Sequence, residues 1–215
     1  MRKVLFTMFC LSATLAMNAQ VSIKETFDSN SFGWTESNYE SSNGSAAIEG
    51  GVMTIKSKGE SKLVAGLNRA FGEDQHISTY FETHCYAPLD VLKPFTIRTK
   101  VHVGKMNDAD RLAGLILNYK DDGNFYAFIF NNEEIRFARY EDNRLVGSVC
   151  QSMKWSKRNN LDQEWVLVYD GNKFQYFVDG LEVLLIRYME MKYAGVGFYV
   201  YGKQELIVDE IEFIQ

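Results

Sequence analysis

Apolar and polar residues alternate through most of the chain after residue 20, and this period of two constrains the fold more than any other feature. Between residues 95 and 103, Phe95, Ile97 and Val101 fall on one face, whereas Arg98 and Lys100 fall on the other. Such alternation is typical of a β-strand with one buried face. No stretch after residue 20 keeps an apolar period of 3.6 residues, so the sequence predicts an all-β protein.

Short turn signals separate the predicted strands. Asp121-Asp122-Gly123-Asn124, Asp170-Gly171-Asn172 and Asp179-Gly180 supply residues that tolerate the positive φ of tight hairpins. Strands before and after the first turn, at 113–119 and 125–130, are apolar on both faces, which predicts a place in the middle of a sheet. Further strands are expected at 52–56, 134–140, 165–169, 174–178, 181–186, 195–201 and 206–213. So many strands without helical runs between them predict a two-sheet sandwich or a barrel.

Two regions are harder to assign. Residues 30–51 are rich in Ser, Asn and Gly and are expected to form a loop with a short strand. Residues 59–90 are ambiguous, with strands expected around 63–67 and 77–83. No segment has the composition of a linker, so residues 20–215 are expected to form one domain.

The first 19 residues have the order of a secretory signal peptide: the basic start Met1-Arg2-Lys3, an apolar run, and small residues ending at Ala19. The apolar run is about 14 residues, short of the roughly 20 that span a bilayer. We therefore expect residues 1–19 to be a signal peptide rather than a membrane span. The domain would be exported to the periplasm, the outer surface or the medium.

The charge of the chain limits the classes of molecule that it can bind. The pI is near 5.3 and the net charge is −5; loss of Arg2 and Lys3 with the leader would make it −7. Nucleic-acid binding needs a basic face, so a nucleic-acid partner is excluded.

Two cysteines, Cys85 and Cys150, would remain after cleavage of the signal peptide. Export makes a disulfide between them one interpretation, and two buried thiols the other.

Three blocks of sequence carry a resemblance to a known family. They are 113–126, 169–180 and 195–209, and the opening Glu25-Thr26-Phe27-Asp28 with Gly33-Trp34 fits the same pattern. Together they resemble the concanavalin A-like lectin/glucanase sandwiches, specifically the laminin-G-like and keto-disaccharide-hydrolase-like modules of secreted Bacteroidetes proteins. The resemblance implies two curved antiparallel sheets in jelly-roll order, with ligands lying across the concave sheet in lectin and glucanase members. Residues 59–90 depart from the family pattern.

Catalytic motifs are missing from the sequence. Laminarinase relatives place their carboxylates on one strand, as Glu-x-Asp-x-x-Glu or Glu-x-Asp-x-Glu, and this chain has neither. The nearest match, Asp209-Glu210-Ile211-Glu212, is interpreted as a solvated acidic face. His76, His84 and His102 form no short-spaced pair, so no metal site is expected, and no nucleophile motif occurs. The sequence thus favours a protein without a catalytic site and without a cofactor.

A structural calcium ion is the one metal that the resemblance keeps open, because many relatives carry one near the edge of the sandwich. The hard oxygen ligands that calcium prefers could come from Asp28, Asp108, Asp110, Asp121, Asp122, Asn124 and Asp209. Asn107-Asp108-Ala109-Asp110 resembles a run of ligands, with a polar turn as the alternative. The sequence defines no firm ligand set.

Aromatic residues make up 14% of the chain and can serve the core or a sugar. Candidate sugar-binding residues are Tyr119, Tyr140, Trp155, Tyr199 and Tyr201, with packing in the sheets as the alternative. The core is expected to take Phe125, Phe128, Phe130, Phe137, Phe174, Phe177, Phe198 and Phe213.

Three functions remain open. The leading hypothesis is a secreted, non-catalytic module that binds glycan or polysaccharide. A divergent glycoside hydrolase or lyase is the second, favoured if two carboxylates meet on an aromatic-lined face. A module for protein interaction in the cell envelope is the third, favoured if that face is filled with apolar side chains.

Overall fold

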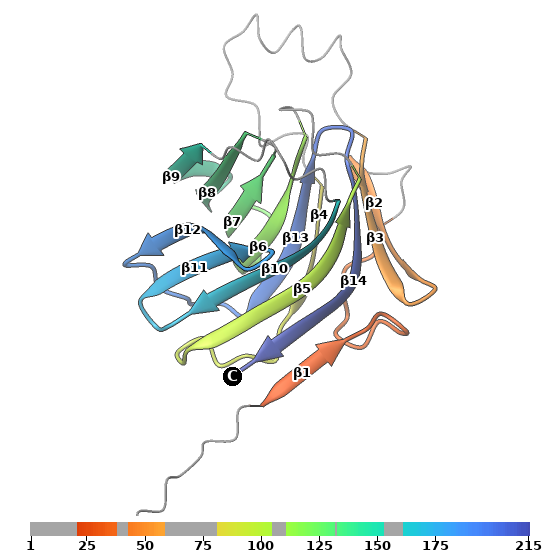
Figure 1. Cartoon of the computed structure of the whole chain (residues 1–215), viewed down its shortest axis with the longest axis horizontal. Coiled ribbons are helices and arrows are strands. Elements are labelled where there is room, and N and C mark those ends of the chain that lie inside the picture. Colours follow the sequence, from red (N-terminus) through yellow and green to blue (C-terminus); the bar gives the residue numbers. More distant parts are fainter. Residues whose placement is uncertain (1–20, 38–42, 59–80, 105–110, 132, 153–160) are drawn as a thin grey trace, which may run out of the picture.

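The computed structural model describes residues 21–37, 43–58, 81–104, 111–131, 133–152 and 161–215. They form fourteen strands in two sheets, and every strand pairing is antiparallel (Figure 1). The described part of the chain contains no helix, and hence no helix that could cross a membrane. The predicted all-β fold with two antiparallel sheets is confirmed. The expected signal peptide, residues 1–19, and the expected strand at 63–67 lie outside the described residues.

The larger sheet has eight strands. Its order is β12 (Leu181–Arg187), β11 (Lys173–Val178), β10 (Asp162–Tyr169), β5 (Phe95–Val103), β14 (Glu205–Ile214), β3 (Val52–Ser57) and β2 (Gly44–Glu49), with β1 (Ser22–Glu25) paired to β14. The smaller sheet has six strands. Its order is β4 (Phe81–Tyr86), β13 (Gly195–Tyr201), β6 (Leu112–Asp121), β7 (Asn124–Phe130), β8 (Glu134–Glu141) and β9 (Arg144–Ser152).

Strand β14 joins distant parts of the chain. One edge pairs with β5 along most of its length, from Leu206 opposite Val103 to Ile214 opposite Thr96. The other edge is shared, with its first half on β3 and its second half on β1 (Figure 1). The last described strand therefore fixes the place of the first one.

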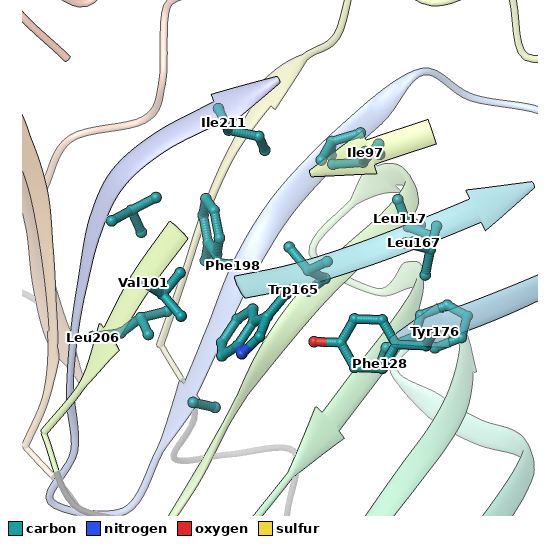
Figure 2. Close-up of a cluster of buried hydrophobic side chains, with 14 of the residues drawn as sticks. Ile97, Val101, Leu117, Phe128, Trp165, Leu167, Tyr176, Phe198, Leu206 and Ile211 are labelled. Atoms are coloured by element: carbon teal, nitrogen blue, oxygen red, sulfur yellow. The ribbon is translucent and has the colours of Figure 1, made fainter. Parts of the chain in front are cut away.

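Alternate side chains of both sheets meet between the layers and form the core (Figure 2). Trp165 is fully buried there, its indole Nε1–H donates to Gln163 Oε1 at 2.9 Å, and its ring packs edge-on against Phe130. Strands β6 and β7 are buried on both faces, which confirms their predicted place in mid-sheet. Phe177 is an exception among the expected core residues, because it alternates with the buried Tyr176 and Val178 and turns to the opposite face of its sheet.

The hydroxyl of Tyr176 is buried in this core without a hydrogen-bond partner, and burial holds the pKa of its phenol well above the ordinary value. Its ring lies beside Phe128 (Figure 2). An unpaired buried hydroxyl costs stability, so Tyr176→Phe should raise the free energy of unfolding by about 1 kcal/mol in urea titrations. The matched control is Tyr126→Phe, which removes a hydroxyl that donates to the Glu190 carbonyl at 3.0 Å and should destabilise the protein. Equal effects of the two variants would contradict the prediction.

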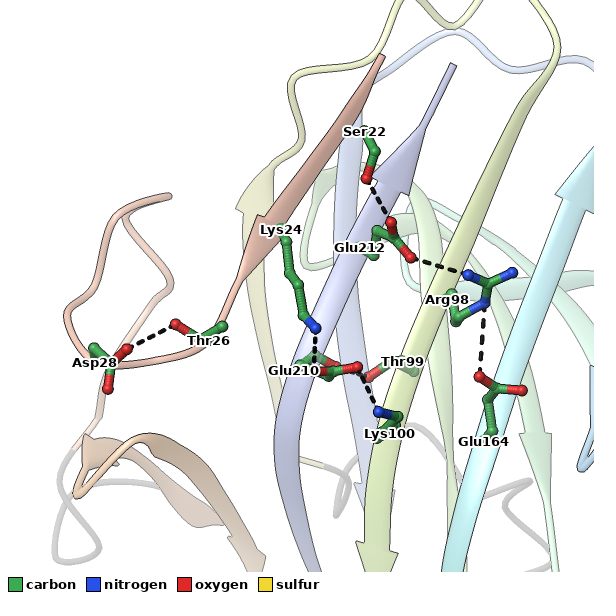
Figure 3. A network of polar contacts seen from close by, with 10 residues as sticks. All are labelled: Ser22, Lys24, Thr26, Asp28, Arg98, Thr99, Lys100, Glu164, Glu210 and Glu212. Atoms are coloured by element: carbon green, nitrogen blue, oxygen red, sulfur yellow. Dashed lines mark hydrogen bonds and ion pairs between the residues drawn. The ribbon is translucent and has the colours of Figure 1, made fainter. Parts of the chain in front are cut away.

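The face of the eight-stranded sheet that is turned away from the core carries rows of alternating charge across neighbouring strands (Figure 3). Glu210 on β14 lies between Lys24 on β1 and Lys100 on β5. Glu212, two residues further along β14, pairs with Arg98 at 3.1 Å. Glu210 and Glu212 therefore share a face, as expected, and both are part-exposed members of an ion-pair network.

This network predicts a pH dependence of stability. Hydrogen bonds from Lys24 and Lys100 hold the pKa of the Glu210 carboxyl below its ordinary value. A lowered folded-state pKa contributes stability that is present above the unfolded pKa, about 4.3, and is lost as the pH falls through the folded value. Between about pH 5 and about pH 3, the wild type should therefore lose more stability than Glu210→Gln. Urea unfolding at several pH values measures this, with Glu49→Gln, an exposed glutamate on β2, as the control. Parallel curves for wild type and Glu210→Gln would refute it.

Candidate functional site

Four of the five predicted sugar-binding residues gather on one surface. Tyr119, Tyr140, Tyr199 and Tyr201 belong to a cluster on the face of the six-stranded sheet that is turned away from the inter-sheet core; we call it the outer face. Tyr199 is fully buried, Tyr119 and Tyr140 nearly so, and Tyr201 is part exposed. Trp155 lies outside the described residues. Buried rings offer no open face for stacking, so sugar binding by these tyrosines stays a prediction.

A row of aromatic rings in contact with one another crosses the outer face. His84 on β4 stacks on Tyr119 of β6, with ring centroids 3.9 Å apart. Tyr119 is followed by Phe125 of β7 at 6.4 Å, and Phe125 by Tyr140 of β8 at 4.8 Å. These four residues, which we call the aromatic row, join side chains from four strands in one line across the sheet.

Two glycines make the first step of the row possible. Strand β13 lies between β4 and β6, with Gly197 opposite His84 and Gly195 opposite Tyr119. A Cβ at Gly195 would lie 2.3 Å from the Tyr119 carbonyl oxygen, and one at Gly197 would lie 2.4 Å from the Thr83 carbonyl oxygen. Because β13 carries no side chain here, the rings of His84 and Tyr119 meet above it.

Two carboxylates flank the His84 end of the row. The Tyr119 hydroxyl lies 2.5 Å from Asp122 Oδ1 and 3.5 Å from Glu82 Oε1, so these two oxygens are no more than 6.0 Å apart. Glu82 Oε2 also lies 3.1 Å from His84 Nδ1. The side chains of Glu82 and His84 are 14% and 17% exposed. The arrangement brings two acids, an imidazole and a phenol together at the edge of solvent.

Exposed aromatic rings lie near both ends of this arrangement. Tyr86 is 63% exposed, and its ring centroid is 6.3 Å from that of His84. Tyr193 is 40% exposed and lines a hollow of about 210 Å³ that also borders Phe125 and Tyr140 of the row. An exposed tyrosine ring is the kind of surface on which a sugar stacks.

The hollow beside Tyr193 has a polar wall. Asn118, which has a positive φ of 52°, accepts hydrogen bonds from the backbone N–H groups of Lys192 and Tyr193 at 2.6 and 2.9 Å. This side chain therefore fixes the segment that carries Tyr193. Lys120 and Arg139 also line the hollow, so it combines hydrogen-bond donors with the exposed ring of Tyr193.

The sequence does not single out Glu82, Tyr86, Asp122 or Tyr193 as sugar-binding residues. The alternation of Glu82, His84 and Tyr86 was the available signal, because it puts all three on one face of a strand. The predicted strand, 77–83, ends before His84 and Tyr86, so the prediction does not assign the three residues to one strand. The described strand runs from Phe81 to Tyr86 and includes all three. For the metal question, no group of three or more His, Cys, Asp or Glu in the described ranges could hold an ion. Of the calcium candidates, Asp108 and Asp110 lie outside those ranges.

The structure does not pair Cys85 with Cys150, so it does not contain the disulfide that was one of the two interpretations. Both thiols are free: Cys85 is buried on β4 and Cys150 is exposed on β9. These strands are the two edges of the six-stranded sheet, five strand spacings or roughly 24 Å apart, whereas a disulfide needs Cα atoms within about 7 Å. The alternative of two buried thiols holds only for Cys85, whose pKa is raised well above the ordinary value by burial.

Comparison with solved structures identifies the fold. The chain superposes on a β-glucanase of Bacillus licheniformis with a TM-score of 0.57 and 9% identity, over 89% of this chain and 97% of that one. The chain has the concanavalin A-like jelly-roll fold. The predicted resemblance is confirmed at the level of fold.

Other matches have the same architecture. The carbohydrate recognition domain of Emp47p gives a TM-score of 0.56 at 10% identity, over 89% of this chain and 93% of that one. The carbohydrate-binding module CBM66 from Bacillus subtilis gives 0.50 at 14% identity, over 83% and 94%. No family model matches the sequence, and no curated protein matches it. This jelly roll thus occurs in both enzymes and binding modules, and the likeness shows the fold alone.

Proposed function

We propose that the protein is an exported, non-catalytic glycan-binding module whose site lies along the outer face, from Tyr86 to Tyr193. The observation that carries the proposal is the aromatic row with exposed tyrosines near its ends and polar side chains beside them. Sugars are recognised by this combination, because their C–H faces stack on rings while their hydroxyls bond to carboxylates, amides and amines. The names of the structural neighbours, which include carbohydrate-binding modules and a carbohydrate recognition domain, support it.

The buried rings have a supporting role in this proposal. Tyr119, Phe125 and Tyr140 do not offer open faces, but each ring packs against the next across the sheet. Tyr119 holds Asp122 by a hydrogen bond, and His84 holds Glu82. A site whose groups are held in place before binding loses less entropy when the ligand arrives.

Calorimetric titration with a panel of soluble polysaccharides tests the proposal. For a polysaccharide that binds, Tyr193→Ala and Tyr86→Ala should each weaken the affinity about tenfold, which corresponds to about 1.4 kcal/mol. Tyr188→Ala is the matched control, because Tyr188 is 82% exposed and does not line the hollow, so the affinity should not change. Absence of binding across the panel, or equal loss in all three variants, would reject the proposal.

A glycoside hydrolase on the same fold is the second candidate, and the pair Glu82 and Asp122 favours it. Their oxygens are no more than 6.0 Å apart around the Tyr119 hydroxyl, a limit that permits the roughly 5–5.5 Å of retaining glycosidases. If the protein is such an enzyme, a polysaccharide that binds should release reducing ends. Glu82→Gln and Asp122→Asn should then abolish release while binding persists. A bound polysaccharide that stays uncleaved would leave the non-catalytic proposal in place.

The third candidate, protein interaction, is favoured by the centre of the outer face, where Ile116 and Tyr199 are fully buried. Because this centre is buried, we place the glycan site at the exposed tyrosines near the two ends of the aromatic row.

A further inference from the structure

A second hollow, of about 330 Å³, lies at the other end of β13. It is formed where β3 and β5 end, where β6 begins, and where the turn Gly202–Gln204 joins β13 to β14. The glycines beneath the aromatic row are at the start of β13, and this turn follows its last residue. The six residue steps from Gly195 to Tyr201 span roughly 20 Å and the four from Gly197 roughly 13 Å, so one sugar ring cannot occupy both places.

The second hollow has an excess of positive charge in an otherwise acidic chain. Lys56, Arg111 and Lys203 line it, and Glu205 is the one carboxylate among its lining residues. Glu205 is already paired with Lys56, at 3.0 Å. The whole chain has a net charge of −5, so the charge of this lining is opposite in sign to that of the protein.

Arg111 and Lys203 are held at the hollow in different ways. Arg111 Nη1 donates to the Lys203 carbonyl oxygen at 2.6 Å, which fixes the guanidinium against the turn. The Lys203 ammonium has no ion-pair or hydrogen-bond partner among the residues that the structure describes. Its positive charge is therefore available to a ligand.

Ser57 supplies an independent observation. It lines the hollow, is 4% exposed, and its hydroxyl has no hydrogen-bond partner. Its backbone N–H donates to the Gln204 carbonyl oxygen at 2.9 Å, so the residue is fixed in place and only the side chain can turn. Buried hydroxyls are nearly always paired, and an orphan one points to a missing partner. A serine hydroxyl can donate one hydrogen bond, so an acceptor bound in the hollow that Ser57 lines can supply the missing partner.

We propose that this hollow binds an oxyanion: a sulfate, phosphate or carboxylate group. Lys203 and Arg111 supply charge-assisted donors, and Ser57 supplies a neutral donor that is otherwise unpaired. Charge-assisted hydrogen bonds to such groups are the strong ones. The group can come as a free anion or as a substituent of a sugar, and both have the same chemistry at the site.

Calorimetry on the full chain tests this at constant ionic strength, with inorganic sulfate, inorganic phosphate, galactose 6-sulfate and galactose as probes. At least one oxyanion should bind, and galactose should not bind at this hollow. Lys203→Gln should weaken oxyanion binding about tenfold, because it removes an unshared charge. Lys173→Gln removes the same charge from β11, where the ammonium is 3.4 Å from Asp170, and should leave binding unchanged. Tighter binding of the sulfated sugar than of free sulfate assigns the site to a glycan substituent, and the reverse assigns it to a free anion.

Ser57→Ala separates binding from structure. Without anion the variant should melt at a higher temperature than wild type, since an unpaired buried hydroxyl is gone. Saturating anion should then raise its melting temperature less than it raises that of wild type. An equal anion-induced shift in melting temperature in both proteins would show that Ser57 does not contact the anion.

The proposal would be overturned if no oxyanion bound, or if Lys203→Gln and Lys173→Gln lost the same amount of oxyanion affinity. Tyr193→Ala should leave oxyanion binding intact, so the outcome is separate from that of the glycan-binding proposal.

Discussion

Replacing Trp165 with alanine is expected to lower the free energy of unfolding by about 3–5 kcal/mol. The indole is fully buried between the sheets, packs edge-on against Phe130 at 5.1 Å, and donates to Gln163 (Figure 2). Its removal leaves a large cavity and also leaves the buried Gln163 carboxamide oxygen without this donor. The cost of the cavity adds to the lost burial because a close-packed interior relaxes only in part.

Urea unfolding followed by circular dichroism measures this loss without relying on tryptophan fluorescence. Trp165→Phe is the matched variant: it keeps a ring but removes the donor, so it should cost less than half as much as alanine. A loss below about 1 kcal/mol for Trp165→Ala would show that the site collapses readily, and would contradict the packing described.

Gly197→Ala should destabilise the protein by about 1–3 kcal/mol and disturb one end of the candidate site. The new methyl group would lie 2.4 Å from the Thr83 carbonyl oxygen and 3.1 Å from His84 Cβ. Both atoms belong to β4, an edge strand of the six-stranded sheet. Strand β4 must move away from β13, and the stack of His84 on Tyr119 must loosen with it.

Gly147→Ala is the control, since a Cβ at Gly147 on β9 meets nothing within 4 Å. It should be neutral within about 0.5 kcal/mol. Cys85 gives a local readout of the same movement: it is buried on β4, so Gly197→Ala should speed its modification by a thiol reagent in a Cys150→Ser background. Unchanged stability and unchanged thiol reactivity would show that the sheet accommodates the methyl group.

The strands could be predicted because their signals are local. Alternation in 95–103 and the turn residues at 121–124 and 179–180 act within a few positions of the chain, and the structure has β5, the β6–β7 turn and the β11–β12 turn there. The two-sided burial of β6 and β7 followed from their apolar faces. Phe177 shows the limit of hydrophobicity alone, because its face is set by the alternation with Tyr176 and Val178.

The candidate site could not be predicted because it depends on strand order. Strand β13 brings His84 and Tyr119 together, yet its glycines lie more than 70 residues beyond either of them in the chain. Glu82 and Asp122 meet only through this pairing. The failed cysteine pairing has the same cause: nothing local places β4 and β9 at opposite edges of one sheet.

The position of β14 has a consequence for how the chain acquires its structure. Its partners β1, β3 and β5 come early in the sequence, and the register joins Ser22 to Ile214. During synthesis, these three strands must wait for the last described strand before the larger sheet can close. Such long-range pairing makes folding slow, because loop closure costs entropy before any contact repays it. The nascent chain therefore exposes unpaired strand edges until β14 has been synthesised, and this is the stage at which a chaperone would be needed most.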